Sequence, residues 1–200
     1  MVRWIVLCLA LVACKKDAPG PPNLGSDDSA REQARFDAER KPEKIVEALA
    51  ITPGSRVADI GAGSGLLTVH LARAVAPNGR VVATDIDSAV LDLLGQRLDK
   101  LGLGSVVERR VVAADKPGLE AGAYDAILLA EVDHFFAKPD DWLAEAKTAL
   151  KPNGRIVIEN RIYHRAQSEA AARKAGLSLV AESNPVPTHF IAVFVAGETK

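Results

Sequence analysis

Three glycines, Gly61, Gly63 and Gly65, lie at alternating positions directly after a short apolar run that contains Asp59. A buried strand that ends in such a turn brings the backbone close to a ligand where a Cβ atom would collide, and the following helix directs its N-terminal amides at that ligand. A second apolar run, residues 81–84, ends in Asp85, a carboxylate placed to accept hydrogen bonds from ribose hydroxyls. The spacing therefore predicts a site for a nucleotide-like cofactor.

The position of the third glycine separates two classes of cofactor. A dinucleotide-binding fingerprint requires glycine at position 66, but this chain has Leu66 there and carries its third glycine at Gly65. A nicotinamide-dependent oxidoreductase is therefore the weaker hypothesis.

Three side chains that can take a proton follow the predicted strand at residues 126–130. These candidate catalytic residues are Glu131, Asp133 and His134. For His134, a structural role beside the following pair of phenylalanines is an equal alternative. Further candidates for the same pocket are Tyr163, His164 and His189, whereas His70 falls within a helical pattern and is expected to be structural.

The elements that must position these residues alternate between strand and helix. Apolar residues three or four apart predict helices, and short continuous apolar runs predict buried strands. Pro42 suits a first helical position, Ser88 a helix cap, and Gly102 and Gly176 helix ends. The residues 151–154 predict a tight turn. The predicted strands are residues 56–60, 80–84, 106–113, 126–130, 155–159, 178–182 and 190–195, and the predicted helices are residues 30–49, 66–75, 88–101, 139–150 and 168–175.

This alternation predicts an α/β fold, a doubly wound and mostly parallel sheet with helices on both faces and right-handed crossovers. Ligands of such folds bind at the carboxyl ends of the strands, where the strand order reverses. The glycine turn and the candidate acids all lie at predicted carboxyl ends of strands. One domain, residues 30–200, is expected to hold the site.

The first residues predict a targeting segment. Arg3 is followed by ten apolar residues, 4–13, which are too few to span a bilayer but suit the apolar region of a secretory signal. The sequence around Cys14 resembles a bacterial lipobox, which implies a signal peptide at residues 1–13, a lipid on Cys14 and a flexible tether at residues 14–29. The domain is then expected at the periplasmic or extracellular face of the cell envelope. An uncleaved apolar tail, with a cytoplasmic domain, is the alternative.

Composition narrows the function further. The formal net charge is −1 and there is no long basic tract, so no nucleic-acid partner is expected. The two cysteines are Cys8, inside the predicted signal, and Cys14. The predicted domain therefore has no cysteine for a disulfide or a cysteine-based metal site, and no metal is expected.

The motif from Asp59 to Gly65 resembles the first motif of the class I S-adenosylmethionine-dependent methyltransferases, acidic-x-Gly-x-Gly-x-Gly. Asp85 matches the family's ribose-binding acid and Asp115 its acid beside the adenine amine. The segment 124–129 looks like the family's fourth-strand motif, and the segment 150–155 is similar to its turn before the fifth strand. The resemblance covers most of residues 36–195 and implies a seven-stranded sheet that ends in an antiparallel hairpin.

The resemblance implies S-adenosylmethionine as the cofactor and transfer of a methyl group to a small-molecule or unknown acceptor. Its cofactor-binding residues would be Asp59, Gly61, Gly63, Gly65, Asp85 and Asp115. For Asp59, an alternative is a structural anchor of the turn. Methyl transfer depends mainly on holding donor and acceptor in attack geometry, so no protein nucleophile is required.

Two alternatives concern the activity. The predicted export signal favours a non-catalytic module that binds the nucleoside, because the cofactor is made in the cytoplasm. Arsenite methyltransferases, which share the implied fold, need cysteines that the predicted domain lacks.

Overall fold

The computed structural model describes residues 26–197. The predicted signal peptide, the predicted acylation site Cys14 and most of the predicted tether lie outside the described residues. Within the described part of the chain, no helix is both long and apolar enough to cross a membrane.

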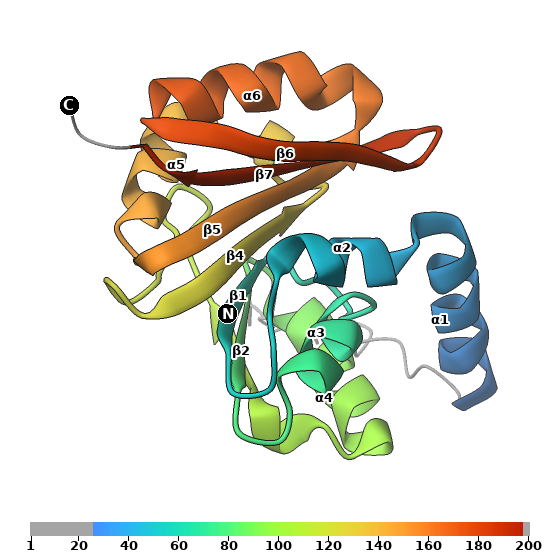
Figure 1. Ribbon diagram of the computed structural model, residues 1–200. Coiled ribbons are helices and arrows are strands. Elements are labelled where there is room, and N and C mark those ends of the chain that lie inside the picture. Colours follow the sequence, from blue (N-terminus) through green and yellow to red (C-terminus); the bar gives the residue numbers. More distant parts are fainter. Residues whose placement is uncertain (1–25, 198–200) are drawn as a thin grey trace, which may run out of the picture.

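One seven-stranded sheet forms the centre of the molecule, with the strand order β3-β2-β1-β4-β5-β7-β6 (Figure 1). Neighbouring strands are parallel from β3 to β5, whereas β7 runs antiparallel to both β5 and β6. The predicted fold class and its C-terminal hairpin are therefore confirmed. The strands are β1 (Arg56–Ile60), β2 (Arg80–Asp85), β3 (Val107–Val111), β4 (Tyr124–Ala130), β5 (Leu150–Arg161), β6 (Leu177–Val186) and β7 (His189–Ala196).

Helices cover both faces of the sheet, as Figure 1 shows. Helices α2, α3 and α4 pack on one face and α5 and α6 on the other, while α1 lies beyond α3 and α4. The helices are α1 (Ser26–Arg40), α2 (Pro42–Leu49), α3 (Thr68–Val75), α4 (Ser88–Leu101), α5 (Pro139–Lys147) and α6 (Arg165–Lys174). Short 3-10 helices span Gly104–Val106, Asp133–Phe135 and Ile162–His164.

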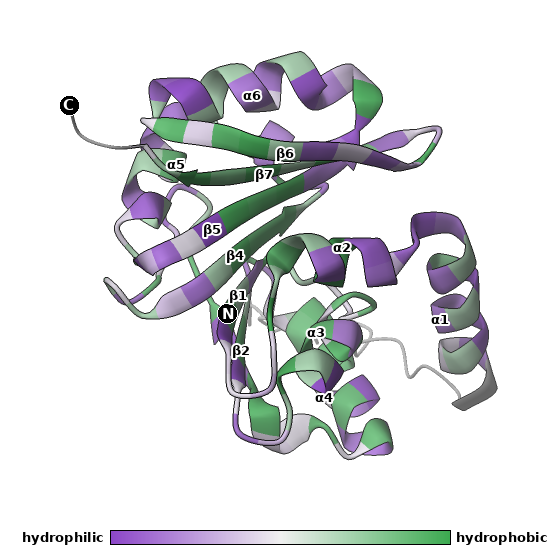
Figure 2. Cartoon of the chain, in the orientation of Figure 1, coloured by the Kyte–Doolittle hydropathy of each residue, from purple (hydrophilic) through white to green (hydrophobic). Residues whose placement is uncertain are grey.

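Alternate residues of each central strand enter different cores, because successive side chains of a strand point to opposite faces. Val57 packs with the α2, α3 and α4 layer, whereas Ala58 packs with the α5 and α6 layer. Ile127 and Leu128 divide in the same way. The central strands are consequently apolar where they are buried, as Figure 2 shows along most of β7 and in the middle of β5.

The predicted helix at residues 30–49 is two helices. Lys41 separates α1 from α2 with a left-handed backbone, φ 53°. The residue before a proline is disfavoured in the right-handed helical region, and Pro42 then begins α2. The break lets α1 turn away from the sheet and pack beside the glycine turn.

The crossover from β3 to β4 contains no helix, in agreement with the predicted elements, which place none between residues 113 and 126. Residues 112–123 form an irregular connection. Glu120 fixes this connection: its carboxylate pairs with Arg110 at 2.9 Å and Arg56 at 3.0 Å, and it accepts a hydrogen bond from the hydroxyl of Tyr124. These contacts hold the helix-free connection against the strands β1, β3 and β4.

Two smaller expectations are corrected by the structure. Asp87, not Ser88, caps α4, because its carboxylate accepts the hydrogen bond from the amide of Ala89 at 2.8 Å. The residues 151–154 are an irregular part of β5 rather than a turn before it, with Asn153 at φ 66°. The predicted helix ends at Gly102 and Gly176 both have the left-handed backbone, φ 67° and 76°.

Candidate functional site

The glycine turn lies at the carboxyl end of β1, between β2 and β4, where the strand order reverses. Gly61, Gly63 and Gly65 all have positive φ, 68°, 53° and 86°. A Cβ atom on Gly61 would lie 2.8 Å from a methyl group of Val132, and one on Gly65 would lie 2.1 Å from Leu94. Gly63 faces open space, with nothing within 4 Å of its Cβ position. The turn therefore packs tightly on two sides and leaves its middle glycine free to meet a ligand.

Two polar groups at the end of β2 face this space. The Asp85 carboxylate accepts hydrogen bonds from the amide of Gly63 at 2.9 Å and the amide of Asp87 at 3.1 Å. The hydroxyl of Thr84 is buried and has no hydrogen-bond partner among the described residues. A buried hydroxyl without a partner costs free energy, so this group is suited to bond a ligand.

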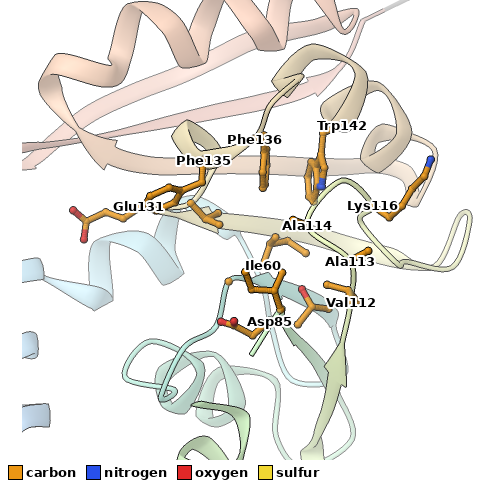
Figure 3. Close-up of a pocket in the computed structure, with 14 residues that line it drawn as sticks. Ile60, Asp85, Val112, Ala113, Ala114, Lys116, Glu131, Phe135, Phe136 and Trp142 are labelled. Carbon is orange, nitrogen blue, oxygen red and sulfur yellow. The ribbon is translucent and has the colours of Figure 1, made fainter. Parts of the chain in front are cut away.

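A cavity of about 450 Å³ extends from the glycine turn across the end of β2, and both Thr84 and Asp85 line it. Its walls are mainly apolar: Val112 lies on one side and the stacked rings of Phe136 and Trp142, 4.4 Å apart, lie on the other (Figure 3), and Ile86 also lines it. A mostly apolar cavity with a few polar groups suits a ring system that carries hydroxyls. The residues present thus fit a nucleoside.

Asp59 does not line this cavity. Its carboxylate is buried, 2% exposed, and accepts a hydrogen bond from the hydroxyl of Thr68 in α3 at 2.6 Å. Burial raises the pKa of Asp59 to about 6, and the nearby Asp85 charge adds to the rise, although the bond from Thr68 opposes it. The geometry matches the structural alternative, an anchor between β1 and α3.

Asp115 is exposed on the crossover between β3 and β4. Its neighbours Ala114 and Lys116 line the cavity. The amine of Lys116 points away from the cavity (Figure 3) and pairs with Glu145 at 2.9 Å. The structure therefore places Asp115 at the rim, in contact range of solvent.

A residue absent from the predicted site, Arg97 of α4, holds the glycine turn against α1. Its guanidinium is 3% exposed and donates to the carbonyl of Ser64 at 2.9 Å and to Glu32 at 2.5 Å. A sequence signal was present: residue 97 is spaced three from Leu94, on the apolar stripe of the helix. His70, expected to be structural, pairs with Asp37 of α1 at 2.8 Å.

Glu131 is the candidate base that the structure brings to the cavity. It follows β4 with a left-handed backbone, φ 50°, and lines the cavity. Figure 3 shows its carboxylate pointing away from Asp85. There it pairs with Arg40 at 2.5 Å, Arg161 at 2.9 Å and His189 at 3.3 Å. Burial alone would raise the pKa of Glu131, but Arg40 and His189 outweigh it, so the pKa is lowered and the group is ionised at neutral pH.

The other two candidate bases have structural contacts. The Asp133 carboxylate is buried, 4% exposed, and accepts hydrogen bonds from Asn160 at 2.6 Å and Ser168 at 2.5 Å. His134 stacks on His164 with ring centroids 4.3 Å apart, and burial and His164 lower its pKa. Neither Asp133 nor His134 lines the cavity beside the glycine turn.

A second cavity, of about 520 Å³, lies between α1 and the turn from β6 to β7. Arg40, Arg161 and His189 line it, and these are the three partners of Glu131. Glu159, at the end of β5, is also bound to Arg40, at 2.5 Å, and burial raises its pKa to about 7. The pattern of an acid after an apolar run, which identified Asp85, is present at Glu159 as well.

In the described residues, no group of three or more histidine, cysteine, aspartate or glutamate side chains is arranged to hold a metal ion.

Comparison with known proteins connects this geometry to a family. Residues 58–156 match the family model of a methyltransferase domain. A ubiquinone/menaquinone biosynthesis C-methyltransferase from Burkholderia mallei is 33% identical over 108 residues, 54% of this chain and 44% of that protein. An uncharacterised 37.1 kDa protein of a Streptomyces fradiae transposon is 32% identical over 126 residues, 62% of this chain and 36% of that protein. The chain thus spans less than half the length of these curated relatives.

Solved structures share the fold. A methyltransferase from Aquifex aeolicus described as dependent on S-adenosylmethionine has a TM-score of 0.75 at 21% identity, over 87% of this chain and all of that one. The geranyl diphosphate C-methyltransferase of Streptomyces coelicolor, solved with S-adenosylhomocysteine, has a TM-score of 0.68 at 16% identity, over 85% of this chain and 83% of that one. At these identities the solved structures show the fold that this chain shares with them. Residues 58–156 thus resemble a methyltransferase domain, and the described residues have the fold of these methyltransferases.

Proposed function

We propose that this chain is an S-adenosylmethionine-dependent methyltransferase that binds its cofactor along the carboxyl ends of β1 and β2. The observation that carries the proposal is the cavity lined by Gly61, Asp85 and Thr84, whose hydroxyl has no partner among the described residues, with Gly63 facing open space next to the Asp85 carboxylate. These groups supply a close backbone approach, a charged acceptor and a neutral hydroxyl to one ligand.

Each part of the cavity suits one part of the cofactor. Asp85 accepts hydrogen bonds from the ribose hydroxyls, and bonds of this charge-assisted kind are stronger than neutral ones. Ile86 and Val112 form an apolar wall for the adenine ring, with Asp115 at the rim beside its amine. The glycine turn from Gly61 to Gly65 receives the remainder, and Asp59 acts through the turn that it anchors.

When bound, the cofactor supplies an electrophilic methyl group on a sulfonium. The chain's own contribution is to orient this donor, to hold an acceptor in line with it and to keep water out. The acceptor is undefined. Glu131 lines the first cavity and contacts His189, which lines the second. We therefore expect the acceptor to bind on the side of Glu131 that faces the second cavity.

Isothermal titration with S-adenosylhomocysteine tests the cofactor site. We expect the wild type to bind and Asp85→Asn to lose about 1.5–3 kcal/mol of binding free energy, roughly 10- to 150-fold in Kd, because a charged acceptor is removed. Asp92→Asn is the matched control, since Asp92 is exposed on α4 and reaches only Arg109, at 3.4 Å. A folded wild type that binds neither S-adenosylhomocysteine nor S-adenosylmethionine would contradict the proposal.

Binding without transfer would instead favour a non-catalytic nucleoside-binding module. Labelled methyl transfer to components of a cell-envelope extract distinguishes the two, because an envelope location follows from the proposed lipid on Cys14. We expect label in the extract with the wild type and a strong reduction with Asp85→Asn at a subsaturating cofactor concentration.

A further inference from the structure

We propose that His189, oriented by Glu131, is the general base that removes the proton from a hydroxyl or amine acceptor bound in the second cavity. This inference rests on the proposed methyltransferase function. It names the base and the class of acceptor.

Glu131 connects the two cavities. Glu131 lines the cofactor cavity beside the glycine turn. Its carboxylate contacts the ring of His189, which lines the second cavity. An acceptor bound in the second cavity would therefore reach the methyl group past one side of the Glu131–His189 pair, with its hydroxyl or amine next to His189.

The hydrogen bonds of His189 define which ring nitrogen is basic. An ionised carboxylate can only accept, so Nε2 of His189 carries the hydrogen that is directed at Oε1 of Glu131, 3.3 Å away. Nδ1 then carries the basic lone pair of the ring. The Thr188 hydroxyl lies 2.9 Å from Nδ1 and lines the same cavity, so it donates to this lone pair, and an acceptor hydroxyl would take its place as the donor.

The charges around His189 favour a neutral ring that can gain a proton. Burial lowers the pKa of His189, and Arg40 of α1 and Arg161 of β5 lower it further, whereas Glu131 after β4 raises it. The ring is 5% exposed. Once the ring is protonated, the Glu131 carboxylate stabilises the imidazolium, as the acidic member does in hydrolase triads.

The other titratable groups nearby are less suited. Glu131 is itself held ionised by two arginines and the histidine. Glu159 lines neither cavity and is fully buried against Arg40. His189 is thus the titratable side chain that is neutral, faces the second cavity and has a carboxylate behind it.

The proton transfer balances with a methyl transfer. The acceptor's O–H or N–H proton moves to Nδ1 of His189, and the acceptor's lone pair forms the new bond to the methyl carbon. The electrons of the S–CH₃ bond return to sulfur, which becomes a neutral thioether. The imidazolium then loses its proton to solvent through the second cavity.

The walls of the second cavity indicate the rest of the acceptor. Phe36, Leu66 and Pro187 contribute apolar surface, and the charged residues of the lining are Glu32, Arg35, Glu39, Arg40 and Arg161. A cavity of this mixed composition suits a molecule with an apolar part and polar groups, one of them the hydroxyl or amine that is methylated. Phenol, 4-nitrophenol and aniline are therefore suitable small probes.

Nitrogen-15 NMR of the histidine rings in the full chain tests the base without any acceptor. For His189, assigned by its loss in His189→Gln, we expect the Nε2–H tautomer, a pKa below 6.5, and a further lowering in Glu131→Gln because the carboxylate raises it. An Nδ1–H tautomer, or a His189 pKa that Glu131→Gln leaves unchanged, would overturn the proposal.

Methyl transfer to the three probes tests catalysis. We expect His189→Gln to lower kcat by about 10²- to 10⁴-fold at pH 7.5, with the KM for S-adenosylmethionine changed less than threefold. The wild-type rise in kcat through the pKa of His189 should also disappear. His164→Gln is the matched control, since His164 lines neither cavity, and should keep its rate. Retention of rate by His189→Gln, or no probe methylated by the wild type, would overturn the proposal.

These experiments distinguish a failure of the methyltransferase function from a failure of the His189 assignment. If the wild type does not bind S-adenosylhomocysteine, the methyltransferase function itself is wrong. If it binds and the tautomer, pKa or rate results are contrary to expectation, only the assignment of His189 and its acceptor class is wrong.

Discussion

Asp59 shows how one buried carboxyl couples the glycine turn to the stability of the fold. The folded protein raises its pKa from 3.8 to about 6, so the folded state holds the proton more tightly than the unfolded chain does. The stabilising contribution is complete below the unfolded pKa and is lost as pH rises through the folded pKa. At neutral pH the anchor of the turn therefore carries an electrostatic cost.

Asp59→Asn should remove this pH dependence. Between pH 5 and pH 8 the wild type should lose about 1–2 kcal/mol of unfolding free energy through Asp59, and the variant should not. Urea unfolding of both proteins at the two pH values gives the double difference, in which the contribution of Glu159 cancels. A difference between the two proteins that is the same at pH 5 and pH 8 would show that Asp59 does not titrate in this range.

At the residue scale, local sequence identified the groups that end strands and failed for groups that meet through tertiary packing. Asp85 and Glu131 each follow an apolar run, so their place at the sheet edge could be predicted. The contacts of Glu131 come from α1, β5 and β7, more than 25 residues away in each case. The spacing within one motif does not indicate contacts between residues so far apart in the sequence. His189 was therefore only one of several candidates for the pocket.

At the element scale, Arg97 determines how α1 is held. Its guanidinium joins α4, the glycine turn and α1, and Gln33 of α1 adds a hydrogen bond to the carbonyl of Leu66 at 2.9 Å. Because these bonds replace a continuous apolar contact, α1 depends on a small number of polar groups for its position.

Arg97→Gln should destabilise the protein by about 3 kcal/mol, since it leaves Glu32 and the Ser64 carbonyl without their partner. Hydrogen exchange should become faster across α1 and the glycine turn, and S-adenosylhomocysteine should bind more weakly. Arg73→Gln, on the exposed side of α3, is the matched control. Unchanged exchange in α1 would mean that other contacts hold the helix.

Glu120, in the helix-free crossover between β3 and β4, is expected to make the stability of the protein depend on pH. Hydrogen bonds from Arg110 and Tyr124 lower the pKa of Glu120 from 4.5 to about 2. Its contribution to stability is therefore present above pH 4.5 and is lost as pH falls through 2. Because the side chain is 47% exposed, solvent screening reduces this contribution to about 1 kcal/mol.

Glu120→Gln should thus be about 1 kcal/mol less stable than the wild type at pH 7, and the difference should shrink between pH 4.5 and pH 2. Chemical denaturation across this range measures it. Glu169→Gln on α6 is the matched control for removal of a glutamate charge. A constant deficit at all pH values would assign the effect of Glu120 to packing rather than to its charge.

Most elements could be predicted from periodicity, and the exceptions have physical causes. The strand at Arg56–Ile60 agrees at both ends, because a glycine turn follows it. No helix was predicted in the β3 to β4 crossover, and the structure has none there. Residues 112–123 include Pro117, Gly118 and Gly122, which disfavour a helix. The prediction of one helix over residues 30–49 did not include the effect of Pro42 on the backbone of the residue before it.

At the scale of the whole molecule, the proposed lipid on Cys14 decides where the domain works. Metabolic labelling with palmitate should mark the wild type and not Cys14→Ala, because the cysteine supplies the acylated group. Cys8→Ala, upstream in the predicted signal, should still be labelled and is the matched control. Equal labelling of the wild type and Cys14→Ala would exclude this anchor and favour the cytoplasmic alternative.

The left-handed backbone of Glu131 bears on how far this protein can be stabilised. A non-glycine residue at φ 50° carries a conformational cost, which glycine or asparagine would largely relieve. Either substitution would also remove the carboxylate that Arg40, Arg161 and His189 share. Selection for thermal stability would therefore favour replacing Glu131, whereas selection for turnover would favour keeping it. Thermostabilising screens that ignore activity should enrich substitutions of Glu131.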